Sequence, residues 1–157
     1  MYAHELTHVA QHRLDPEGTA PAWVREGHAQ WVAYRVVDLL ELQPYTRLRD
    51  QQRRVIVAST TPRDQFPPLS TLETHEAWRQ AVKGSGWAPT YGQTFLAVDR
   101  LVERYTEARL REFLRGYLPA RLVTRPGRRD PREWHAVFGI PYDQFMAEFR
   151  EYLETLR

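Results

Sequence analysis

Apolar residues recur at the three- and four-residue spacing of an α-helix along most of this chain, whereas alternation with a period of two is nearly absent. The clearest stretch lies between residues 88 and 105. Its apolar positions are Phe95, Val98, Leu101, Val102 and Tyr105. The pattern predicts an all-α fold with little or no sheet, a helical bundle of roughly six to eight helices.

Proline, glycine and capping residues divide this pattern into separate helices. Pro21 suits a helix start, Pro44 ends that helix, Thr46 suits the N-cap of the next, and Thr106 separates two later helices. The expected helices span residues 2–13, 22–42, 46–58, 72–82, 88–105, 107–117, 131–138 and 142–156. Three prolines predict a loop over residues 60–70. With no internal repeat, residues 1–157 read as a single domain.

Composition narrows the possible chemistry. The chain has no cysteine, so disulfides and thiolate metal sites are excluded, and any metal must be held by His, Asp or Glu. No run of eighteen apolar residues is present, which predicts no membrane span. His and Glu already occur among the first residues, so no signal peptide is expected. The compartment is not indicated.

Basic residues gather in one stretch that contains Arg121, Arg125, Arg128, Arg129 and Arg132. The net charge of the whole chain is only +2. The stretch also contains Pro126 and Gly127, and no aromatic residues interleave with the arginines. A solvated loop is therefore favoured over a phosphate or nucleic-acid contact, and no nucleic-acid partner is expected.

The segment His4-Glu5-Leu6-Thr7-His8 contains the pattern H-E-x-x-H. On a helix, His4 and His8 are one turn apart and lie on the same face, so that both imidazoles can bind one metal ion. Glu5 is turned about 100° away from His4 and can accept a proton from a water on that ion.

A third ligand is expected near the start of the second helix. Glu26 lies in the segment Trp23-Val24-Arg25-Glu26-Gly27, and a turn around Pro16 and Gly18 can bring this helix back against the first. Glu26 would then face the two histidines. Gly27 would permit a close approach between helices.

These two motifs together resemble those of the gluzincin metallopeptidases, in particular their peptidase MA-like, aminopeptidase-related members. In that family the second motif reads W-x-x-E-G-x-A, and its Glu is the third zinc ligand. The resemblance implies that His4, His8 and Glu26 bind Zn²⁺ and that Glu5 is the general base. It also implies that Tyr91, in a later helix, donates a hydrogen bond to the oxyanion.

The implied activity is zinc-dependent hydrolysis of a peptide or protein substrate. Zinc lowers the pKa of a bound water to about 7, and Glu5 accepts its proton and passes it to the leaving amine. Thermolysin-like relatives have an Asp four residues after the third ligand, which orients a zinc histidine. Gln30 stands there in this chain and is expected to accept the same imidazole N–H.

The family normally carries a β-sheet before the zinc helix, whereas only three residues precede His4 here. Three explanations remain open: the chain is a fragment of a longer catalytic domain, the sheet has been lost, or an upstream or partner β-sheet domain supplies it. The alternative to an enzyme is a catalytically inactive peptidase-like helical domain that acts as a binding or scaffolding module.

Several residues have a simpler interpretation than a role in catalysis. His12 is expected in solvent or behind a ligand, and His28 in the core or on the surface rather than in the cleft. Trp23 and Trp31 are expected in the core. For Tyr91, packing at a helix start competes with the catalytic role.

Overall fold

The structure of the protein, a computed structural model, describes residues 2–116 and 131–156. Within these ranges all regular secondary structure is helical, which confirms the predicted all-α fold. The elements are α1 (Tyr2–Leu14), α2 (Ala22–Leu39), α3 (Tyr45–Val57), the short 3-10 helices η1 (Arg63–Gln65) and η2 (Leu69–Thr71), α4 (His75–Ser85), α5 (Trp87–Arg115), α6 (Pro131–Phe138) and α7 (Tyr142–Thr155). The Arg121–Arg132 stretch lies almost wholly outside the described residues.

Some helix boundaries differ from the prediction. α2 ends at Leu39, not at 42. Thr46 is not the N-cap of α3, because that helix begins at Tyr45 with Pro44 at the cap position. α4 begins at His75 rather than 72, because the hydroxyl of Thr74 accepts a hydrogen bond from the Ala77 N–H and caps it there.

The predicted break at Thr106 is present. α5 is continuous from Trp87 to Arg115 apart from Thr106, whose backbone has φ 77° and ψ 155°. A β-branched residue rarely adopts a positive φ, so this break is a strained position held by the packing around it. It turns the chain immediately before Glu107.

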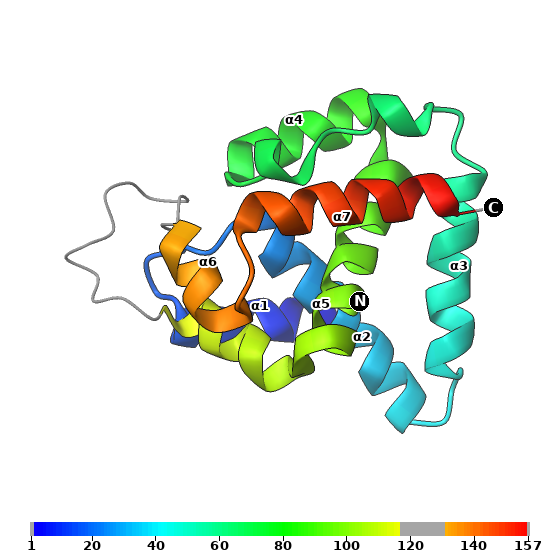
Figure 1. The fold of residues 1–157 in the computed structure, drawn as a ribbon. Helices are drawn as coiled ribbons and strands as arrows, with labels where there is room; N and C mark the ends of the chain where they lie inside the picture. The colour runs from blue at the N-terminus through cyan, green and yellow to red at the C-terminus, as the bar shows by residue number, and fades with distance from the viewer. Residues whose placement is uncertain (1, 117–130, 157) are drawn as a thin grey trace.

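α5 runs through the middle of the molecule (Figure 1) and packs against α2, α3, α4 and α6. Aromatic side chains fill the core between α2, α5, α6 and α7. Trp23 of α2 is fully buried there, stacks on Phe145 and donates an indole N–H hydrogen bond of 3.0 Å to the hydroxyl of Tyr142. This confirms the expected core position of Trp23 and fixes α2 relative to α7.

The first turn of α2 is held from both sides. Pro21 offers no side-chain cap, but the backbone N–H groups of Ala22 and Trp23 donate to the carbonyls of residues 73 and 72. On the other side, Asp15 accepts hydrogen bonds from the Thr19 hydroxyl and the Ala20 N–H, which closes the turn after α1. These bonds set the position of the residues one turn further along α2.

Gly27 allows α2 and α5 to approach closely. A Cβ atom added at Gly27 would lie 2.4 Å from the carbonyl oxygen of Thr94 and 2.7 Å from a methyl carbon of Val98. The expected close approach therefore occurs, and its partner is α5.

Replacing Gly27 with Ala is expected to lower the free energy of unfolding by about 3 kcal/mol, the upper part of the overpacking range, because the obstacle is backbone. Urea titration followed by circular dichroism measures it. Gly84→Ala is the matched control: its Cβ would meet nothing within 4 Å inside α4, so stability should stay the same or rise by up to about 1 kcal/mol. Equal stability of both variants would contradict the close approach.

Candidate metal centre

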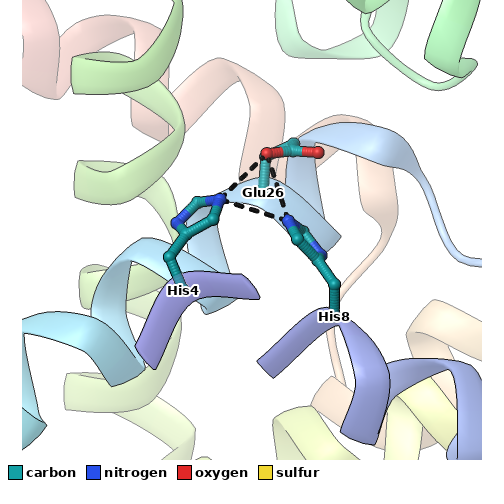
Figure 2. A group of neighbouring side chains, drawn as sticks. All are labelled: His4, His8 and Glu26. Atoms are coloured by element: carbon teal, nitrogen blue, oxygen red, sulfur yellow. Dashed lines mark hydrogen bonds and ion pairs between the residues drawn. The ribbon is translucent and has the colours of Figure 1, made fainter. Parts of the chain in front are cut away.

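Two histidines of α1 and one glutamate of α2 converge on a single point (Figure 2). The Nε2 atoms of His4 and His8 are 3.1 Å apart. A carboxylate oxygen of Glu26 lies 3.5 Å from the first and 3.6 Å from the second. The sequence motifs predicted this group of three, and the described part of the structure contains no other His, Asp or Glu group so placed.

The spacing of these atoms fits a tetrahedral ion. Ligand bonds of about 2.1 Å in a tetrahedron place neighbouring ligand atoms about 3.4 Å apart. The three observed separations, 3.1, 3.5 and 3.6 Å, lie on either side of this value. Two imidazole nitrogens and one carboxylate oxygen also form a donor set that suits zinc and leaves one position open.

The charges in the cluster favour a cation at its centre. Burial opposes ionisation of Glu26, but hydrogen bonds from His4 and His8 and their charges outweigh it and lower the pKa of Glu26 to about 2. The hydrogen bond to Glu26 raises the pKa of His8 above 6.5 against the effect of burial. Both shifts mean that a positive charge among the three side chains is stabilised, which a proton or a metal ion can supply.

Glu5 lies beside this cluster and is not part of it. Its side chain is exposed on α1, and its charge is close enough to contribute to the raised pKa of His8. An exposed carboxylate next to the ligands is accessible to a water molecule at the site, the position expected of a general base.

Tyr91 lies on α5. Its ring is half-buried between the indoles of Trp78 and Trp87, with ring centroids 4.9 and 4.8 Å away. Burial raises the pKa of the Tyr91 hydroxyl, and the charges of Glu26 and Glu5 add to this. Tyr91 therefore packs among aromatic rings, and its pKa also responds to the charges of Glu26 and Glu5. A packing role and a catalytic role for Tyr91 are compatible.

The residue behind His8 is Gln11, which the sequence analysis missed. Its amide oxygen lies 2.8 Å from His8 Nδ1, and the side chain is only 2% exposed. Gln30, expected in this role, instead hydrogen-bonds the hydroxyl of Tyr34. The sequence contained a signal for this contact, because Gln11 follows His8 by three residues and so lies on the same helix face.

His12, His28 and Trp31 lie outside the ligand cluster. His12 is exposed, in line with the solvent interpretation. His28 was expected either in the core or on the surface; it is buried, and its Nδ1 lies 3.1 Å from the amide nitrogen of Gln11. Trp31 packs against the core next to His28.

The comparisons with known proteins give no match: no protein-family model fits the chain, and no curated protein and no solved structure is significantly similar to it. The resemblance to gluzincin metallopeptidases therefore rests on the two motifs and on the geometry of three side chains. None of the described helices combines the length and apolar character needed to cross a membrane.

Proposed function

We propose that this protein is a zinc-dependent hydrolase of peptide bonds, of gluzincin type. The observation that carries the proposal is the tetrahedral spacing of His4 Nε2, His8 Nε2 and a Glu26 carboxylate oxygen. It supports the resemblance because H-E-x-x-H and W-x-x-E-G, two motifs distant in the sequence, come together as that family requires.

In this proposal, the metal ligands and the general base are different residues. His4, His8 and Glu26 hold the ion, which would supply Lewis-acid activation of water and of the substrate carbonyl. Glu5 accepts the proton of the attacking water and later delivers it to the leaving amine. Because Glu5 is exposed and unconstrained by packing, it can reach both positions.

Tyr91 donates a hydrogen bond to the oxyanion that develops on the substrate carbonyl. A tyrosine hydroxyl is protonated at neutral pH, as a donor requires, and burial of Tyr91 raises its pKa further. Contacts with Trp78 and Trp87 hold the ring in place before substrate binds, so little reorganisation is needed.

Zinc content and turnover test the proposal together. The purified protein is expected to bind about one zinc per chain. It should also cleave members of a mixed synthetic peptide library, detected by mass spectrometry, with activity lost on chelation and restored by zinc. Absence of stoichiometric zinc would contradict the metal centre. Zinc without turnover would instead support a catalytically inactive binding module.

A further inference from the structure

Gln11 is a buried amide with a partner at each end. Its oxygen lies 2.8 Å from His8 Nδ1. Its nitrogen donates to the backbone carbonyl of Arg25 at 2.8 Å and lies 3.1 Å from His28 Nδ1. The amide therefore connects α1, which provides two candidate ligands, with the turn of α2 that provides the third.

The partner at Arg25 fixes which way the amide points. A backbone carbonyl only accepts hydrogen bonds, so the NH₂ group of Gln11 must face Arg25 and its oxygen must face His8. An amide oxygen only accepts, so His8 Nδ1 must carry the proton. In the neutral ring, the lone pair of His8 then lies on Nε2, the atom that faces His4 and Glu26, whereas only the protonated ring can also donate from Nε2 to Glu26.

The same logic assigns His28. Its Nδ1 accepts from Gln11, so the proton of the neutral ring lies on Nε2. That atom is buried and lies 3.9 Å from a carboxylate oxygen of Glu107, directly after the break in α5. The negative charge of Glu107 favours this tautomer, and the ring of His28 stacks on Trp31. The second acceptor of the Gln11 amide is thus also held in place.

From these contacts we propose that Gln11 is a positioning residue of the metal centre: it holds His8 in the tautomer whose Nε2 lone pair points at the ion. The inference builds on the proposed zinc site and deepens it. Without this amide, a neutral His8 exchanges between two tautomers, and the one protonated on Nε2 cannot bind the ion through that atom, which faces the other two ligands.

Gln11→Leu, which keeps the approximate size of the side chain and removes its polar atoms, is expected to lower zinc affinity about 10- to 100-fold. Competition with a chromophoric chelator measures this. Gln30→Leu is the matched control: it makes the same substitution at the glutamine that sequence reasoning favoured, and zinc affinity should stay at the wild-type value. Wild-type affinity in Gln11→Leu, or an equal loss in both variants, would overturn the proposal.

A second measurement needs neither a variant nor metal. In ¹⁵N NMR spectra of the metal-free wild-type protein with a neutral His8 ring, that ring is expected to carry its proton on Nδ1, the atom that faces the Gln11 oxygen. A proton on Nε2, or a mixture of tautomers, would overturn the proposal even if zinc binds. Failure of the wild type to bind zinc would contradict the proposed function, whereas the tautomer still decides the role of Gln11.

Discussion

The Glu5→Gln variant is expected to bind zinc like the wild-type protein and to hydrolyse peptides about 10²- to 10⁴-fold more slowly, the usual contribution of a general base. The substitution keeps the shape of the side chain and removes its ability to accept a proton. Glu5 is exposed and outside the ligand cluster, so neither folding nor metal binding should change. Initial rates on a cleaved peptide and zinc content of the same sample measure both quantities.

Glu17→Gln is the matched control. It removes the same charge from an exposed position in the turn just after α1, and its rate should equal that of the wild type. Loss of zinc together with activity in Glu5→Gln would assign Glu5 to metal binding rather than proton transfer. An unchanged rate would exclude it as the base.

Local sequence patterns were sufficient for most of the fold. The three- and four-residue periodicity predicted the helices, and Thr106, a residue typical of helix caps, predicted the break in α5. Pro44 predicted the end of α2 less well, because that helix already ends at Leu39. The position of His4 relative to His8 also follows from helix geometry alone. The boundaries at Thr46 and Leu72 were wrong because several nearby residues can start a helix, and tertiary contacts select among them.

Local sequence patterns do not contain all the information needed to identify Gln11 as the hydrogen-bond partner of His8. Gln30 was expected there because it occupies the position at which thermolysin-like relatives carry an Asp, four residues after the third ligand, but whether it reaches a histidine depends on how α2 is rotated against α1. Packing of Gly27 on α5 sets that rotation, and Gln30 then lies beside Tyr34. The carbonyl of Arg25, which orients Gln11, could not be predicted from the sequence either, because every residue has a backbone carbonyl.

α1 buries little apolar surface against the rest of the protein. Three of its larger apolar side chains face outward: Tyr2, Leu6 and Val9 are 88%, 67% and 54% exposed. The residues that α1 buries are Thr7 and Gln11, both polar. Burial of a Leu or Val contributes about 1.5–3 kcal/mol, and α1 gains little of this. The helix must therefore be held by polar contacts to α2, of which a shared metal ion would be the strongest.

Zinc is accordingly expected to protect α1 against hydrogen exchange far more than it protects the rest of the chain. An ion at about 1,000 times its dissociation constant stabilises the bound state by about 4 kcal/mol. Amide exchange through local opening of α1 should then slow about 10³-fold, because opening α1 separates His4 and His8 from Glu26. Amides of α7, which bears no ligand and buries Phe145, Phe149 and Leu153, should change little.

The Glu26→Gln variant distinguishes zinc that bridges α1 and α2 from zinc that stabilises the whole protein. It leaves both histidines on α1 and removes the ligand on α2, so zinc should no longer connect the two helices and most of the protection should disappear. Mass spectrometry of deuterium uptake, with and without chelator, measures each helix in one experiment. If the amides of α1 exchange equally slowly in the chelated protein, protein contacts alone hold the helix. Uniform protection of α1 and α7 would show instead that zinc acts on global unfolding, which the polar interface of α1 argues against.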